Sequence, residues 1–259
     1  MTPERGRSSR AVEPLLPDLV GNPLLARYGE LADQQGASGD ERRSLVGRYS
    51  FAIPTDEALA AIAAVSPRGV VDLGAGTGYW ARLLNDNGVD VVAYDLVPPP
   101  STDSQWFAGV TPWYPVAEAG DEVVEHHADR TLLIVWPGRN DEWAARAVAA
   151  YQRVGGRSLA YVGEGPGGPT GDDQLHALLG HIEYCLACAY GLLETACTCA
   201  RHQQWERRAT IELPHWEGFS DDLHLYRPRH PTASRQPRAR ARAPSRRNLQ
   251  SDRRPRRRR

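Results

Sequence analysis

The sequence predicts an α/β fold in which a doubly wound, mostly parallel sheet ends in an antiparallel hairpin at its C-terminal edge. Between residues 69 and 193, short apolar and β-branched runs alternate with segments of helical periodicity. This alternation is typical of parallel strands joined by helices that cover both faces of a sheet. The last two strand-like runs are separated only by "HWEGFS", so we expect them to pair as a hairpin.

The first 46 residues are rich in proline, glycine and charge, and we expect a flexible lead-in with one short helix from Pro23 to Gln34. The first helix of the sheet domain is expected directly after Pro54. Thr55 is its predicted N-cap, because acids follow in the first turn and apolar residues then recur at helical spacing. Those apolar residues are Ala58, Leu59, Ile62 and Val65.

The strands and helices of the sheet domain follow in a regular order. Strands are predicted at "GVVDLG" (69–74), "VDVVAYDL" (89–96), "RTLLIVW" (130–136) and "RSLAYVGE" (157–164), with a weaker one near "WYPV" (113–116). Helices are predicted at "TGYWARLLNDNG" (77–88), "DEWAARAVAAYQRVGG" (141–156) and "DDQLHALLGHIEYCLACAYGLL" (172–193). The closing hairpin comprises "ERRATIELP" (206–214) and "DDLHLYRPR" (221–229).

Charge divides the chain into two parts. From Arg227 to Arg259 fourteen arginines stand against the single acid Asp252, whereas residues 1–226 hold 17 arginines against 31 acids, a charge of −14. We therefore expect three regions: a lead-in (1–46), a globular domain (47–227) and a disordered Arg/Pro-rich tail (228–259) that has too few apolar residues to fold. The charge of the tail indicates non-specific contact with nucleic acid, contact with the acidic body of the chain itself, or an extension without a partner.

No part of the sequence indicates a membrane protein. No stretch approaches the roughly 20 consecutive apolar residues of a transmembrane helix, and the N-terminal segment lacks a signal-peptide core. We therefore expect a cytoplasmic protein without membrane contact. The sequence indicates no oligomeric state.

A glycine-dense turn follows the first predicted strand, in "VVDLGAGTGYWARLL" (70–84). In an open parallel sheet, ligands bind beyond the carboxyl ends of the strands, and glycines there let the backbone approach a ligand closely. Dinucleotides and S-adenosyl-L-methionine (SAM) both use such a turn. The dinucleotide fingerprint requires a third glycine where this chain has Tyr79. Asp72, two residues before Gly74, suits a cationic ligand such as SAM better than a pyrophosphate.

An acid also ends the second predicted strand. Asp95 stands 21 residues after Gly74, where a carboxylate can accept hydrogen bonds from both hydroxyls of a ribose. Either cofactor class would use this acid, so it supports a nucleoside without distinguishing between the two.

With these two motifs the chain resembles the class I SAM-dependent methyltransferases, whose first motif is an acid-x-Gly-x-Gly-x-Gly turn and whose second strand ends in a ribose-binding acid. The resemblance spans roughly Arg48 to Arg227. It implies a Rossmann-like, seven-stranded sheet with a reversed strand at the edge, and SAM as the cofactor. It further implies that the methionine part of SAM contacts Asp72, Gly74, Gly76 and Gly78, that Asp95 binds the ribose, and that Tyr79 and Leu96 flank them.

Several stretches, among them "RYSFAIPTDEAL" and "LPHWEGFSDDLHLYRPR", are similar to a group of little-characterised methyltransferase-like proteins. The implied activity is methyl transfer to an unidentified acceptor, with a small molecule favoured. Three alternatives remain at this point. They are a non-catalytic SAM- or nucleoside-binding module that engages nucleic acid through the tail, a nicotinamide oxidoreductase, and a glycine turn without a ligand.

Catalytic candidates must lie at the carboxyl ends of the strands. Methyl transfer from a sulfonium requires alignment, exclusion of water and sometimes a base. Trp136 directly follows the fourth predicted strand, and Glu164 ends the fifth. Methyltransferases of exocyclic amines carry Asn or Asp, then Pro-Pro and an aromatic residue, after the fourth strand. "WPGR" (136–139) lacks that polar residue, so Trp136 is predicted either to face the acceptor or to pack, and Glu164 either to act as a base or to remain solvated.

Other residues are candidates for the pocket wall and for a metal. Aromatic residues and a proline beside the domain, Tyr49, Phe51, Pro54, Trp113 and Tyr114, are expected either to cover the cofactor or to join the core. A CxxC pair is followed by a CxC pair, which supplies enough ligands for zinc but departs from the usual knuckles. The alternative is that these cysteines are small buried residues. The zinc candidates are Cys185, Cys188, Cys197 and Cys199, with His181 and His202 nearby.

Overall fold

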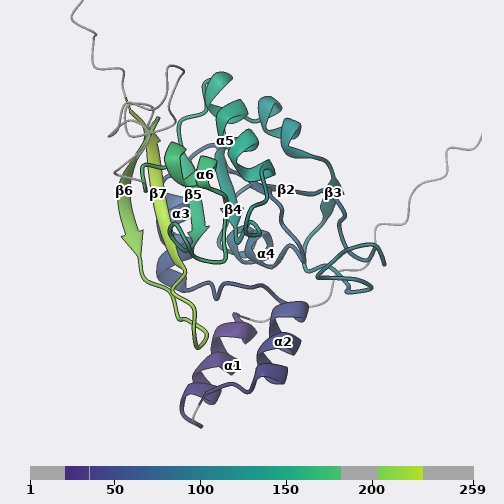
Figure 1. Cartoon of the computed structure of the whole chain (residues 1–259). Coiled ribbons are helices and arrows are strands. Elements are labelled where there is room, and N and C mark those ends of the chain that lie inside the picture. The colour runs from purple at the N-terminus through teal and green to yellow at the C-terminus, as the bar shows by residue number, and fades with distance from the viewer. Residues whose placement is uncertain (1–20, 35, 182–203, 230–259) are drawn as a thin grey trace, which may run out of the picture. The chain divides into compact units, whose positions relative to one another are not determined.

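A seven-stranded sheet in the order β3-β2-β1-β4-β5-β7-β6 forms the centre of the molecule (Figure 1). The computed structural model describes residues 21–34, 36–181 and 204–229. The strands are β1 (Val70–Leu73), β2 (Val91–Asp95), β3 (Val116–Glu118), β4 (Thr131–Val135), β5 (Leu159–Gly163), β6 (Trp205–Ile211) and β7 (Asp222–Pro228). The first five pair in parallel, and β7 runs antiparallel to both β5 and β6. The predicted doubly wound sheet with an antiparallel C-terminal hairpin is therefore confirmed.

The strand order reverses between β1 and β4. From β1 the chain moves outward through β2 to β3, and it returns to the other side of β1 at β4. Val70 pairs with Val91 on one side and with Thr131 on the other, so β1 lies between two parallel neighbours. A crevice opens at such a reversal beyond the carboxyl ends of the strands.

Helices cover both faces of the sheet, which explains why the central strands read as almost continuous apolar runs. On one face α3 (Asp56–Ala64) and α4 (Tyr79–Asp86) join a buried cluster with Val70 and Leu133. On the other face α5 (Trp143–Arg153) and α6 (Asp173–Leu178) join a second cluster with Val71 and Leu132. The 3-10 helix η1 (Asp121–His126) contacts α5.

The predicted start of α3 is confirmed. Thr55 is the N-cap, and its Oγ1 accepts a hydrogen bond of 3.1 Å from the backbone N–H of Ala58. The weak strand near "WYPV" begins only at Val116, the last residue of that stretch. The predicted helix over 172–193 is described as far as His181, and residues 182–193 lie outside the described ranges.

The N-terminal region differs from the expected flexible lead-in where it is described. It contains α1 (Pro23–Ala32), which confirms the short helix, and α2 (Gly39–Arg48), which was not predicted. Ser38 and Glu41 form a capping box at the start of α2, a signal that was present in the sequence. Leu24 of α1 is fully buried in the cluster of α3 and α4, so these helices contribute to the core.

The hydroxyl of Tyr79 attaches α1 to the sheet domain. It donates a 2.8 Å hydrogen bond to Oδ1 of Asn22 and accepts a 3.2 Å hydrogen bond from the backbone N–H of Leu24. The side-chain amide of Asn22 in turn donates to the carbonyl of Pro54 at 2.7 Å. In the described parts of the chain, every helix is too short or too polar to cross a bilayer.

Candidate functional site

A cavity of about 660 Å³ lies where β1, β2 and β4 end. Its lining includes the turn after β1 (72–77), the end of β2 (95–96), the segment before α3 (49–51) and the segment after β4 (135–139). Of the predicted cofactor residues, six line it and Gly78 does not. The six are Asp72, Gly74, Gly76, Tyr79, Asp95 and Leu96.

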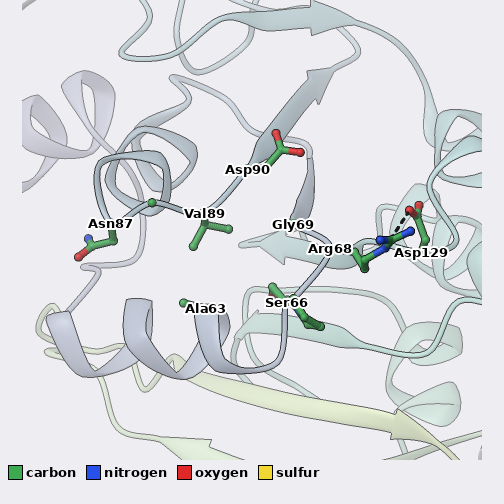
Figure 2. Close-up of a pocket in the computed structure, with 10 residues that line it drawn as sticks. Ala63, Ser66, Arg68, Gly69, Asn87, Val89, Asp90 and Asp129 are labelled. Atoms are coloured by element: carbon green, nitrogen blue, oxygen red, sulfur yellow. Dashed lines mark ion pairs between the residues drawn. The ribbon is translucent and has the colours of Figure 1, made fainter.

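A second hollow lies at the opposite edge of the sheet, where the strands begin (Figure 2). Its lining includes Ser66, Asn87 and Asp90. Arg68 and Asp129 form an ion pair of 4.0 Å there, and both side chains are largely exposed. This hollow is at the edge away from the strand reversal and contains none of the predicted site residues.

The three glycines of the turn all adopt left-handed backbone conformations, with φ of +71° at Gly74, +53° at Gly76 and +72° at Gly78. Side chains of this protein also lie close to each one. An added Cβ would lie 2.8 Å from the ring of Trp143 at Gly74 and 2.5 Å from the ring of Phe107 at Gly76. Glycine is therefore required by backbone conformation and by internal packing, in addition to any ligand.

At Gly78 the same space is filled by Tyr114 and Val116, because a Cβ there would lie 2.9 Å from Cβ of Tyr114. This glycine allows the chain to pass close to β3, and it does not reach the cavity lining. The predicted contact of Gly78 with the cofactor therefore stays a prediction.

Asp95 fixes the shape of the turn. Its Oδ2 accepts a 2.9 Å hydrogen bond from the backbone N–H of Gly76, and its Oδ1 accepts a 3.0 Å hydrogen bond from the N–H of Val97. An ionised carboxylate has about four acceptor positions. Asp95 can therefore hold the turn and still accept hydrogen bonds from a ligand in the cavity that it lines.

Asp72 is a buried acid without a partner. The residue is 1% exposed, lines the cavity, and its Oδ1 has no hydrogen-bond partner. Burial, and secondarily the charge of Asp95, raise the pKa of Asp72 to about 8. A buried polar atom without a partner is costly unless a bound group completes its environment. A cation or an N–H donor in the cavity would supply that group.

Trp136 occupies a strained position directly after β4. Its φ is +52°, a rare value for a residue other than glycine, and its indole stacks on Phe51 with ring centroids 4.9 Å apart. The indole N–H faces the carboxyl group of Asp221. Burial raises the pKa of this carboxyl group, and the nearby indole N–H partly offsets the rise. The geometry falls short of a full hydrogen bond, since the indole Nε1 and both carboxyl oxygens of Asp221 are buried without a hydrogen-bond partner. Trp136 lines the cavity and also packs on Phe51, so a role toward the acceptor stays a prediction.

Glu164 lies outside the cavity lining. Its Oε1 accepts a 3.0 Å hydrogen bond from the backbone N–H of Ser220, and its own N–H donates to Oγ1 of Thr170 at 2.8 Å. These bonds connect the loop after β5 to the loop before β7. The carboxylate of Glu164 therefore stabilises the contact between these two loops. Pro169, in the loop after β5, does line the cavity.

The aromatic residues expected at the pocket wall divide into two groups. Tyr49 and Phe51 line the cavity, whereas Pro54, Trp113 and Tyr114 do not. Trp113 instead stacks on the outer side of Tyr49 at a centroid distance of 5.2 Å. Tyr114 donates a 3.0 Å hydrogen bond to the carbonyl of Val91.

Sequence reasoning missed several lining residues. Trp106 and Phe107 come from the loop between β2 and β3, and the length of this loop was the available signal, since long loops in compact domains often carry function. Asp121 and Arg146 also line the cavity and form a two-pronged ion pair at 3.0 and 3.1 Å. Arg139 lines its mouth.

The zinc prediction falls largely outside the described residues, which exclude Cys185, Cys188, Cys197, Cys199 and His202. His181 is described, and its Nδ1 lies 3.0 Å from Nδ1 of His176. Within the described ranges no three histidine, cysteine or acidic residues are grouped so as to hold a metal ion. The tail after Arg229 is likewise outside these ranges, so its contact with nucleic acid stays a prediction.

The strand order, the reversed β7 and the acid-flanked glycine turn at the strand reversal define a class I methyltransferase fold, of the Rossmann-like type. No family model and no curated protein sequence matches the chain.

Solved structures with the same general fold are similar at low sequence identity. Magnesium protoporphyrin IX methyltransferase from Synechocystis PCC 6803 with bound SAH is 14% identical over 78% of this chain and 94% of that one, at a TM-score of 0.39. The same enzyme with bound SAM is 11% identical over 82% and 100%, also at 0.39. An uncharacterized protein from Listeria monocytogenes serotype 4b is 12% identical over 68% and 69%, at 0.39. These similarities are weak, and the architecture rests on the strand order of the chain itself.

Proposed function

We propose that this protein is a SAM-dependent methyltransferase whose cofactor occupies the cavity at the carboxyl ends of β1, β2 and β4. The observation that carries the proposal is Asp72, a carboxyl group that is 1% exposed and lines this cavity with one oxygen unpartnered. SAM carries a sulfonium and an amino group and has no phosphate. Such a ligand would place a positive charge beside the unpartnered carboxyl group of Asp72.

The remaining lining residues fit the rest of the cofactor. The volume of about 660 Å³ lies within the range of roughly 300 to 1,000 Å³ that is usual for small-molecule sites. Asp95 stands at the end of β2 with acceptor capacity for ribose hydroxyls, and Leu96 beside it offers an exposed apolar surface. The ring of Phe107 lies against Gly76, so a ligand there packs on that ring or displaces it.

When bound, SAM would supply a transferable methyl group: the carbon–sulfur bonding pair would stay on sulfur, an acceptor lone pair would form the new bond, and an acceptor O–H or N–H would lose its proton to the bulk solvent. The chain contributes alignment and exclusion of water. Tyr49, Phe51 and Trp136 form an apolar wall beside the acidic turn, and such a wall favours a dry reaction site.

A nicotinamide cofactor fits this site less well. The third glycine of the dinucleotide fingerprint is replaced by Tyr79, a buried residue whose hydroxyl is bonded to Asn22 and Leu24. The buried carboxyl group of Asp72 would also lie close to a pyrophosphate, which carries the same sign of charge.

Calorimetry on the full chain with SAM, S-adenosylhomocysteine (SAH) and NADH tests the proposal. We expect SAM and SAH to bind and NADH not to bind. Asp72→Asn should weaken SAM at least tenfold, whereas Asp129→Asn at the opposite edge of the sheet should leave SAM affinity unchanged. Binding of NADH with no response to SAM would overturn the assignment.

A second measurement separates an enzyme from a binding module. The protein is incubated with SAM and cell extract, and the formation of SAH and of methylated products is followed by mass spectrometry. We expect SAH to accumulate with the wild-type chain and to fall at least tenfold with Asp72→Asn. Tight SAM binding without any SAH formation would contradict catalysis.

A further inference from the structure

We propose that the half of the cavity lined by Phe51, Trp106 and Trp136 binds a planar aromatic small molecule that carries an anionic substituent, and that this molecule is the methyl acceptor. The inference deepens the proposed function, because it assigns a substrate class to the same cavity. Four features of the lining support it: its division into two chemical halves, an exposed tryptophan, an aromatic cluster and one unpaired arginine.

The two halves of the lining differ in chemistry. One half holds the acids and the glycines of the turn, including Asp72 and Asp95. The other half is lined by Phe51, Trp106 and Trp136, followed by the segment 137–139. A ligand in this second half meets aromatic rings and few groups that can hydrogen-bond, so its main surface must be apolar.

Exposed apolar residues border this cavity. In the described parts of the chain only three large hydrophobic residues are exposed, and two of them, Leu96 (68%) and Trp106 (61%), line the cavity. Leu96 adjoins Asp95 on the half assigned to the cofactor. Trp106 belongs to the aromatic half, where no cofactor group is assigned. A large ring left in water at the edge of a cavity is typical of a surface that a ligand covers.

The aromatic half is organised around Phe51. Its ring meets Trp106 edge to face at 5.4 Å and lies parallel to Trp136 at 4.9 Å. It also meets Phe107 edge to face at 6.2 Å. Rings that are already fixed against one another lose little entropy when a guest ring packs on them. The cluster therefore favours a flat, rigid guest over a flexible aliphatic chain.

Arg139 is the charged group available to such a guest. It is exposed, lines the mouth of the cavity, and has no ion pair or hydrogen bond with the residues that the structure describes. Arg146 is the other arginine of the lining, and it is already paired with Asp121 and Glu142. Asp141 lies against Gly138 and is not within ion-pair distance of Arg139. An unpaired guanidinium is suited to a carboxylate or a phosphate group.

The charge of the body argues against a nucleic-acid acceptor at this site. Residues 1–226, which contain the cavity, carry a net charge of −14, whereas the arginines that attract a polyanion are concentrated in residues 227–259. A small molecule with one anionic group can pair with Arg139 and is repelled less by the acidic surface than a polyanion is. We therefore assign the acceptor to small aromatic acids.

Binding of 2-naphthoate to the full chain tests this assignment, with 2-naphthylmethanol as the neutral aromatic control and cyclohexanecarboxylate as the non-aromatic control. Affinity is measured by calorimetry and by quenching of tryptophan fluorescence, with and without saturating SAH. We expect 2-naphthoate to bind at least tenfold more tightly than either control. Arg139→Gln should abolish the preference over 2-naphthylmethanol, and Trp106→Ala should reduce the preference over cyclohexanecarboxylate.

Arg68→Gln, in the hollow at the opposite edge of the sheet, is the matched control and should change none of these affinities. Equal affinity for all three probes, no probe binding, or displacement of bound 2-naphthoate by a 12-nucleotide RNA would overturn the assignment. Failure of SAH to bind would count against the proposed cofactor. Because the probes are also measured without SAH, their relative affinities would still support or overturn the aromatic-acid assignment in that case.

Discussion

Asp72 is the residue at which stability and ligand binding oppose each other. In the native protein its pKa is raised from 3.8 to about 8, chiefly by burial, so near neutral pH the native state holds a proton that the unfolded chain has already released. The native state consequently loses stability as pH rises from about 4 to 8. A bound cation would reverse this penalty.

We predict that Asp72→Asn raises the thermal midpoint of the ligand-free protein at pH 7.5 while it weakens SAM binding at least tenfold. Asparagine has the same shape and no charge to desolvate, so the expected gain in unfolding free energy is about 1 to 3 kcal/mol. Thermal melts with and without SAM measure both effects. A lower midpoint in the variant would indicate that the carboxyl group stabilises the fold.

The affinity for SAM should depend on pH through the same group. Only ionised Asp72 attracts a cation, and its pKa of about 8 leaves it mostly protonated at pH 6. Affinity should therefore rise between pH 6 and 8, by at most about tenfold per pH unit, and level off above. Calorimetry over this range measures the slope. A similar slope in Asp72→Asn would assign the dependence to another group.

At the scale of elements, α1 contributes to the core although the composition of its region suggested a flexible lead-in. Leu24 is fully buried, and truncation to alanine should cost about 2 to 4 kcal/mol of unfolding free energy. The matched variant is Leu96→Ala, because Leu96 is 68% exposed and its truncation should change stability by less than about 0.5 kcal/mol. Urea unfolding of both variants measures the difference. Equal, small effects would contradict the packing of α1.

A chain of buried histidines connects α6 and β7. Nε2 of His176 contacts the carbonyl of Thr170, so it must carry the proton, and Nδ1 of His176 then accepts from Nδ1–H of His181. This leaves Nε2 of His181 to accept from the hydroxyl of Tyr226. Every member of the chain is satisfied when both rings are neutral.

Burial lowers the pKa of His181 to about 3 and that of His224, on β7, to about 4. The unfolded chain binds these protons below its ordinary histidine pKa of 6.5, so stability should fall as pH decreases from about 6.5 to 4. We predict that His224→Asn, which can keep the contact with Thr210, makes this fall shallower. Thermal midpoints of both proteins between pH 4 and 7 measure it, and parallel curves would contradict the role of His224.

For the whole molecule, the sequence predicted the sheet well and the cavity only in part. Strands buried on both faces read as apolar runs, and the short predicted connection "HWEGFS" left the two closing strands one pairing, so local pattern was sufficient. The glycine turn with Asp72 is also a local sequence pattern, and it correctly predicted one end of the cavity. The approach of Phe107 to Gly76 could not be read from the sequence, because it depends on how a long loop folds back. Glu164 was equally undetermined, since its partner Ser220 comes from a distant loop.

The double role of Tyr79 has a consequence for protease resistance. The residue lines the cavity, and its hydroxyl holds Asn22 and Leu24 at the start of α1. A ligand that immobilises this ring also keeps the N-terminal helices docked, because binding to the native state lowers the population of any locally opened form. We predict that saturating SAM slows tryptic cleavage at Arg27 and Arg43 in the wild-type chain, and that Tyr79→Phe weakens this protection while cleavage at Arg208 on β6 keeps its rate. Filling a pocket at one end of the sheet would thus determine how long the two N-terminal helices survive digestion.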